Sequence, residues 1–157
     1  MVVFPAFQAL SQNPVLRRCI HNPKEECMEA VKISWDNCDN ATFLHIRFDG
    51  CVCNSSAVKK CDCIIFRFGF GRSTMFVIEI KEENPDITEV KAQLQTCLDM
   101  MIALLPDPKS QFEIIPVLCA KSFSGLRKRS FWNYRVTVFG KKILIKKRQR
   151  GEDINKL

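Results

Sequence analysis

Residues 60–66 of this 157-residue chain read KCDCIIF and residues 75–81 read MFVIEIK, and both runs have the character of β-strands. Ile, Val and Phe dominate them, and such side chains favour strands. Between the runs, residues 69–72 read GFGR and form a turn signal because glycine accepts the backbone angles that tight turns need. The stretch therefore predicts a β-hairpin.

The two acidic residues of this hairpin are predicted to lie side by side. A turn centred on Phe70 and Gly71 places Asp62 directly opposite Glu79. Lys81 points to the same face, because side chains alternate along a strand. Like charges opposite each other destabilise a sheet, so the pair indicates a divalent cation.

Both faces of the predicted hairpin are apolar. Ile64 and Phe66 share the face of the carboxylates, whereas Cys61, Cys63 and Ile65 point to the other face. Strands that are apolar on both faces belong in the middle of a sheet that is covered on both sides. The alternative is an exposed charge cluster at a strand end, where an ion pair contributes little.

The order of predicted elements indicates an α/β fold in a single domain, residues 1–157, with a central mixed sheet flanked by helices. Asp86 and Glu89 have the spacing of a helix-capping pair. An extra C-terminal β-hairpin is expected around Gly140 and Lys141. The elements are a helix over 23–34, strands over 42–48, 60–68 and 74–81, a helix over 86–105, a strand over 112–119, and hairpin strands over 134–139 and 143–147.

The positive charge is concentrated at the C-terminus, from about residue 126. Residues 126–157 contain 11 basic and 2 acidic side chains, and the remainder contains 13 basic and 15 acidic ones. Such clustering indicates a nucleic-acid partner, with a solvated basic tail as the alternative. The candidate nucleic-acid-binding residues are Arg127, Lys128, Arg129, Lys141, Lys142, Lys146, Lys147 and Arg148.

The nine cysteines are expected to be reduced core residues. Their number is odd, and several of them lie inside apolar runs, where a thiol behaves as a small hydrophobe. We therefore expect an intracellular, reducing compartment and a cytoplasmic protein; no signal peptide or membrane span is expected. The alternative is a zinc module built from two C-x-C pairs, Cys51, Cys53, Cys61 and Cys63.

Asp62, followed by Glu79-Ile80-Lys81 on the next strand, resembles the signature of the PD-(D/E)XK nuclease superfamily, also called the restriction-endonuclease-like fold. The predicted order from about residue 23 to 119 is similar to the αβββαβ core of that fold. Residues 93–97, QLQTC, resemble the Q-L-x-x-Y motif of many relatives, with cysteine in place of the aromatic residue. Lys60 and Cys61 replace the proline of the signature, at a commonly degenerate position.

The resemblance implies a metal-dependent deoxyribonuclease, a phosphodiester hydrolase that uses Mg²⁺ or Mn²⁺. Asp62, Glu79 and the backbone carbonyl of Ile80 would bind the metal. Glu29 or Glu26 of the first helix would add a ligand. Oxygen ligands of this kind suit Mg²⁺.

The resemblance also implies a catalytic role for Lys81, beside the attacking water or the phosphate, and for Gln93, which would orient the lysine or the water. Gln95 is the alternative to Gln93. The implied partner is DNA, and a homodimer would supply the two cuts that a duplex requires. The alternative function is a non-catalytic nucleic-acid-binding protein of the same fold.

Overall fold

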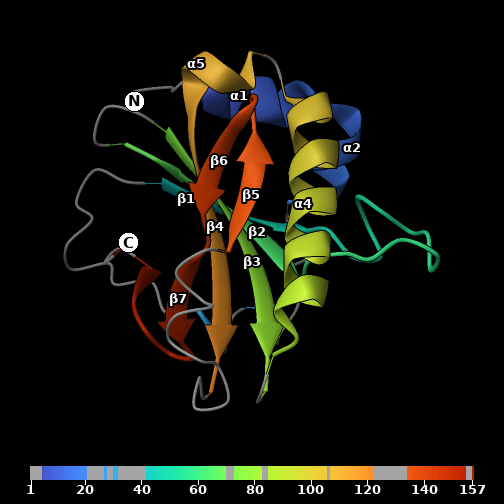
Figure 1. Ribbon diagram of the computed structural model, residues 1–157. Helices are drawn as coiled ribbons and strands as arrows, with labels where there is room; N and C mark the ends of the chain where they lie inside the picture. The colour runs from blue at the N-terminus through green and yellow to red at the C-terminus, as the bar shows by residue number, and fades with distance from the viewer. Residues whose placement is uncertain are drawn as a thin grey trace.

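The computed structural model describes residues 5–20, 27, 30–31, 42–69, 73–82, 85–105, 107–121, 134–154 and 157. Its described elements combine helices and strands in one chain, as expected for an α/β protein (Figure 1). The helices are α1 (Pro5–Gln12), α2 (Pro14–Cys19), α4 (Ile87–Leu104) and α5 (Pro108–Gln111). The strands are β1 (Thr42–Arg47), β2 (Cys63–Phe68), β3 (Ser73–Lys81), β4 (Phe112–Ala120), β5 (Arg135–Val138), β6 (Lys141–Leu144) and β7 (Lys146–Gln149).

A five-stranded mixed sheet forms the centre of the fold, in the order β1-β2-β3-β4-β7. The β1–β2 and β2–β3 pairs are antiparallel, whereas β3–β4 and β4–β7 are parallel. The predicted register of the β2–β3 hairpin is confirmed, since Cys63 pairs with Ile78 and Ile64 with Val77. All residues of β3 except Lys81 are buried, as expected for a strand in the middle of a covered sheet.

Two hydrophobic clusters cover the two faces of this sheet. The first contains β-strand residues such as Val77 and Leu118, and it is closed by α1, α2, α4 and the β5–β6 hairpin. In Figure 1 that hairpin lies beside α4. The second cluster, on the opposite face, includes Cys63, Ile78 and Cys119. The predicted alternation of the hairpin side chains is confirmed for β2 and β3.

Helix α4 begins and ends close to where its sequence pattern predicts. The Asp86 side chain accepts hydrogen bonds from the backbone N–H groups of Thr88 (2.9 Å) and Glu89 (3.3 Å). This cap satisfies donors that have no partner inside the helix. The apolar stripe of the helix is buried against the sheet: Ile87, Val90, Leu94, Cys97, Leu98 and Met101.

The C-terminal strands differ from the prediction in one respect. The expected hairpin is present, and its turn is formed by Phe139 and Gly140, which both have positive φ (51° and 74°). The predicted second strand, 143–147, is however divided at the buried Ile145. Residues before it belong to β6, and residues after it form β7, which enters the central sheet beside β4.

The predicted helix over 23–34 lies mostly outside the described residues. Of its residues the structure describes Cys27, Ala30 and Val31, which are buried in the second cluster. The Val31 N–H donates to the Cys27 carbonyl at 3.2 Å, the spacing of an α-helical turn. None of the helices in the described ranges combines the length and apolarity needed to cross a membrane.

Candidate functional site

Asp62 is held beside β3 by two hydrogen bonds. Its backbone N–H donates to the carbonyl of Ile78 at 3.1 Å, and its carboxylate Oδ2 accepts from the backbone N–H of Ile80 at 2.7 Å. The side chain thus takes the N–H that a longer β2 strand would have used, and β2 begins only at Cys63. The Asp62 carboxyl is thereby placed next to that of Glu79, and its negative charge raises the pKa of Glu79.

Glu79 is a buried carboxyl group with an unusual environment. Only 2 % of the residue is exposed, and Oε1 lies 3.0 Å from the ammonium Nζ of Lys81. Oε2 is buried and has no hydrogen-bond partner among the described residues. Burial, together with the charge of Asp62, raises the pKa of Glu79 to about 8. Lys81 lowers this pKa and so offsets part of the increase.

Helix α4 brings a polar stripe toward this pair. Glu89, Gln93 and Cys97 follow one another at a spacing of four residues, so they lie on one face of the helix. Cys97 is disulfide-bonded to Cys61, the residue before Asp62, and this bond fixes which way the stripe points. The Gln93 Oε1 atom is buried and has no hydrogen-bond partner within the described part of the chain. Gln93 therefore has unused hydrogen-bonding capacity on the face of α4 that also contains Glu89 and Cys97.

Gln95 has a different position and a different task. Its Oε1 accepts the backbone N–H of Thr137 at 2.7 Å, and its Nε2 donates to the Thr137 carbonyl at 2.8 Å. The side-chain amide thus pairs with β5 as a neighbouring strand would, and it attaches the hairpin to α4. Of the two glutamines that the sequence left as alternatives, Gln93 is the one whose amide oxygen is unengaged.

The two glutamines are expected to give opposite results when each is replaced by leucine. Gln95→Leu removes two hydrogen bonds that hold the hairpin, which lowers the free energy of unfolding by about 1–2 kcal/mol. Gln93→Leu removes a buried, unpaired oxygen and leaves stability unchanged or raised. Urea denaturation of both variants measures this difference, and equal losses of stability would contradict the assignment.

The oxygen atoms at this site match the preferences of Mg²⁺ and Mn²⁺. Asp62 and Glu79 supply carboxylates, and the peptide carbonyl of Ile80 lies between Glu79 and Lys81. The unpaired Oε2 of Glu79 is a lone-pair donor with no protein partner in the described ranges. No group of three or more His, Cys, Asp or Glu side chains with metal-binding geometry occurs among the described residues. Glu26 and Glu29 lie outside them.

The zinc alternative is not supported, and the expectation of reduced cysteines is wrong for four of them. Cys51 is disulfide-bonded to Cys19, and Cys61 to Cys97. Cys53 belongs to the first hydrophobic cluster and Cys63 to the second, on opposite faces of the sheet. Cys61 itself lies in the first cluster, not opposite Ile80 as the register predicted, because the ladder stops at Cys63. The prediction of a reducing, cytoplasmic location loses this support.

The basic residues Lys146, Lys147 and Arg148 do not act as one patch. In β7, Lys147 pairs with Leu118 of β4, which in turn pairs with Glu79 of β3. Paired residues of neighbouring strands share a face, so Lys147 lies on the face of the carboxylates, two strands away. Lys146 and Arg148 point to the opposite face, where Arg148 lies 3.7 Å from the Glu152 carboxylate.

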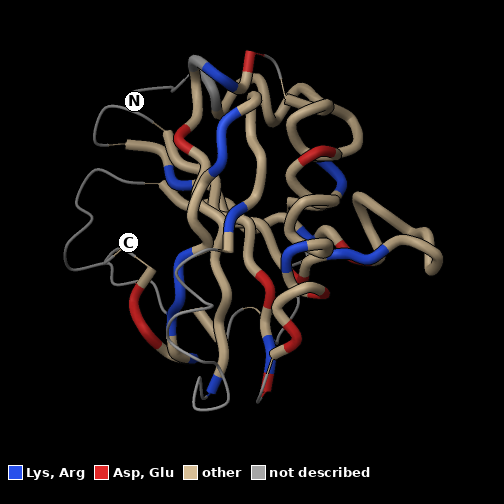
Figure 2. The backbone as a smooth tube through the Cα atoms, viewed as in Figure 1, with Lys and Arg blue, Asp and Glu red and all other residues tan. Residues whose placement is uncertain are grey.

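The other predicted basic residues fall into two groups. Arg127, Lys128 and Arg129 lie outside the described residues, and Lys141 and Lys142 lie on strand β6 of the C-terminal hairpin. Charge counting in the sequence missed the contribution of residues distant in the chain, among them Lys91 of α4. Figure 2 shows basic segments on the hairpin strands, whereas α4 contributes a single basic position.

An acidic residue just after β3 was also missed by the sequence analysis. Glu82 binds Lys121 (2.7 Å) and Arg150, so it joins the ends of β3, β4 and β7. The hydrogen bonds from Lys121 and Arg150, together with the positive charges of these two side chains, lower the pKa of Glu82. The ion-pair group encloses the end of the sheet at which Lys81 lies.

Glu79→Gln is expected to flatten the pH dependence of stability in the metal-free protein. The pKa of Glu79 is about 8 when folded, against an ordinary value of 4.5, so between these pH values the folded state binds the extra proton. The free energy of unfolding therefore falls as pH rises across this window, by about 1.4 kcal/mol per pH unit, and the contribution is lost above pH 8. Urea denaturation in EDTA from pH 5 to 9 measures the slope, with the exposed Glu113→Gln as the matched control. An unchanged slope in Glu79→Gln would contradict the pKa assignment.

The chain matches no protein-family model, no curated protein and no solved structure.

Proposed function

We propose that this protein is a metal-dependent deoxyribonuclease that hydrolyses phosphodiester bonds. The observation that carries the proposal is the buried Glu79 carboxyl, whose Oε2 has no partner among the described residues and which lies between Asp62 and Lys81. Two carboxyl groups held together at low exposure repel each other unless a proton or a cation lies between them. A divalent cation would relieve this repulsion.

The fold proposed with this function is the restriction-endonuclease-like one. Support comes from the order of the elements: three antiparallel strands β1, β2 and β3, then α4, then β4 parallel to β3. The Asp62 and Glu79-Ile80-Lys81 positions lie at one end of β2 and β3, as the resemblance requires. Nucleic acid is also favoured by the excess of basic side chains in residues 126–157.

The chain's own residues have distinct tasks in the proposed reaction. Asp62, Glu79 and the carbonyl of Ile80 would hold Mg²⁺ or Mn²⁺, with Glu29 or Glu26 as a further ligand. The bound ion would lower the pKa of a water molecule and offset charge on the phosphate.

Lys81, whose ammonium lies 3.0 Å from Glu79 Oε1, would place its positive charge beside the phosphate. Its charge would then stabilise negative charge that develops in the transition state. Gln93 would accept a hydrogen bond from the attacking water through its unengaged Oε1. Lys147, on the same face, would contact a neighbouring phosphate.

The proposal is tested by incubating the protein with linear, supercoiled, single-stranded and branched DNA in Mg²⁺ or Mn²⁺. We expect cleavage of at least one substrate, and its loss in EDTA. DNA binding without cleavage of any substrate would instead favour a non-catalytic nucleic-acid-binding protein. Analytical ultracentrifugation with and without duplex DNA would test the proposed homodimer.

A further inference from the structure

Three cations surround a cavity between α4 and the C-terminal hairpin. The cavity has a volume of about 280 Å³ and is lined by Lys91, Arg135, Thr137 and Lys142. No carboxylate lines it, and none of the three cations forms an ion pair with a described residue. Like charges gathered around a hollow without a counter-charge attract an anion.

The arrangement of these cations is set by regular structure. Arg135 and Thr137 are the exposed positions of β5, and Thr137 pairs with Lys142 of β6, so these three side chains share the outer face of the hairpin. The double hydrogen bond from Gln95 holds Thr137 against α4. Lys91 is one turn before Gln95 on the same side of the helix, and it faces the hairpin.

The cavity and the carboxylate pair use different sides of α4. Lys91 is two residues from both Glu89 and Gln93, so it lies roughly half a turn around the helix from them. The cations of the cavity therefore form a binding surface that is separate from the carboxylates.

An exposed aromatic ring lies at the far end of the hairpin. Phe139 is 37 % exposed, and no other large hydrophobic side chain is as exposed among the described residues. Its φ of 51° is in the left-handed region, which bulky side chains rarely adopt and which glycine or asparagine would occupy more easily. The backbone conformation of the turn therefore gives no reason for a phenylalanine at position 139.

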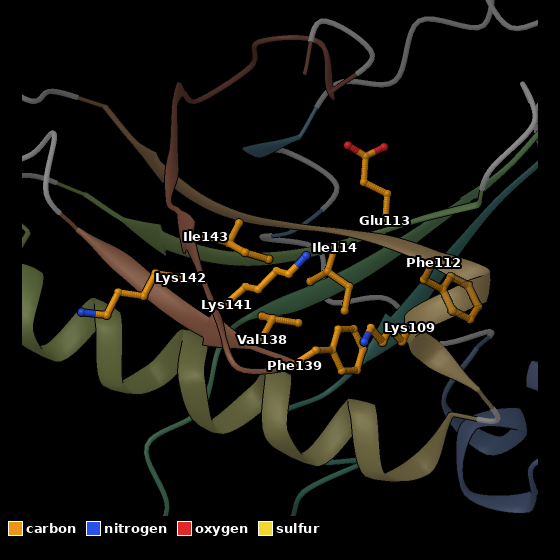
Figure 3. A pocket seen from close by; sticks show the side chains of 9 residues that line it. All are labelled: Lys109, Phe112, Glu113, Ile114, Val138, Phe139, Lys141, Lys142 and Ile143. Carbon is orange, nitrogen blue, oxygen red and sulfur yellow. The ribbon is translucent and has the colours of Figure 1, made fainter.

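The ring has basic neighbours. It lines a second cavity, of about 430 Å³, together with Lys109, Lys141 and Phe112 (Figure 3). Lys141 and Lys142 point in opposite directions from β6 (Figure 3). Lys142 lines both cavities, and one carboxylate, that of Glu113, also lines the second. An aromatic ring among cations that follow a backbone is the combination by which proteins hold single-stranded nucleic acid.

We propose that the α4–hairpin face binds a single DNA strand, with phosphates at Lys91, Arg135 and Lys142 and a base stacked on Phe139. This inference rests on the proposed nuclease function and assigns a surface that would hold the substrate strand. The occupant is a single strand because stacking on Phe139 needs an unpaired base.

The test measures binding of a fluorescein-labelled oligothymidine of about 16 nucleotides by the full chain in EDTA, where cleavage does not occur. Replacing Arg135 and Lys142 with alanine should weaken binding and reduce the slope of log K against log salt by about 0.7 for each cation. Lys59→Ala, an exposed lysine outside the two cavities, should change neither quantity beyond the small effect of net charge.

Phe139 is tested by a variant that favours the turn. Phe139→Asn suits the left-handed backbone and should preserve or raise the melting temperature, yet it should weaken binding roughly tenfold or more; Phe139→Tyr should bind like the wild type. Unchanged binding in Phe139→Asn would overturn the single-strand assignment, and an unchanged salt slope in the Arg135/Lys142 variant would overturn the whole path. Cleavage of saturating DNA in Mg²⁺ by the same variants reports separately on the nuclease proposal.

Discussion

Lys81→Met is expected to lower the rate of DNA cleavage in Mg²⁺ by about 100-fold or more. The substitution keeps the aliphatic stem and removes only the ammonium, which lies 3.0 Å from Glu79 Oε1 at the end of β3. A preorganised cation in a poorly hydrated site contributes more to the transition state than the same charge in water. Single-turnover cleavage with saturating metal measures the effect on the chemical step.

Asp62→Asn should have an effect of similar size for a different reason. It removes the charge of one carboxylate next to Glu79 and so weakens the metal site, and a higher concentration of Mn²⁺ should recover part of the activity. Lys121→Ala is the matched control, because Lys121 ends the neighbouring strand and binds Glu82 but does not contact the carboxylate pair. Melting temperatures establish that each variant is folded. Wild-type rates in Lys81→Met would show that this site does not carry the activity.

The second large effect is expected on breaking the Cys61–Cys97 disulfide. The bond closes a loop with a sequence separation of 36 residues, and it connects the segment of Asp62 to the middle of α4. Replacing both cysteines with alanine should lower the free energy of unfolding by about 3–4 kcal/mol, because the unfolded chain regains the freedom of that loop. Urea denaturation without reductant measures the loss.

Comparison with the other disulfide shows whether the Cys61–Cys97 bond only stabilises the fold or also positions the candidate site. The Cys19–Cys51 pair, with a sequence separation of 32 residues, joins α2 to the turn after β1, so its double alanine variant is a matched control for stability. We expect both variants to lose similar stability and the Cys61/Cys97 variant to lose more cleavage activity. If dithiothreitol left the unfolding curve of the wild type unchanged, the disulfides would not contribute to stability as stated.

The register of the β2–β3 hairpin could be predicted because two local rules agreed. Alternation of side chains and a single glycine-rich turn left one arrangement that buried both apolar faces. The same reasoning failed two residues beyond the ladder, at Cys61. There the Asp62 side chain takes the Ile80 N–H, so β2 begins later, and the chain turns toward α4. Competition between a side chain and the backbone for one donor is not visible in a hydrophobic pattern.

The candidate site was predictable in its strand residues and less so in its helix residues. Glu79 and Lys81 lie on β3, and Asp62 directly precedes β2, so the register of the hairpin brings the three residues to one end of the sheet. Gln93 and Gln95 are two positions apart on α4, one on each side of the buried Leu94 in the sequence. Their roles diverge only because the hairpin reaches Gln95, a contact across 42 residues that no local pattern contains.

Sequence alone determined the hairpin, its carboxylate pair, helix α4 with its Asp86 cap, and the accumulation of charge near the C-terminus. These features follow from the spacing of residues within one or two adjoining elements. Only the tertiary structure decided that β7 enters the central sheet beside β4, which turns Lys147 toward the carboxylate face and Lys146 and Arg148 away from it. It also decided that Cys61 meets Cys97, and that Lys91 meets Arg135 and Lys142. The physical reason is that periodicity specifies which face of an element is apolar, whereas the neighbour that covers this face is selected by the packing of the whole chain.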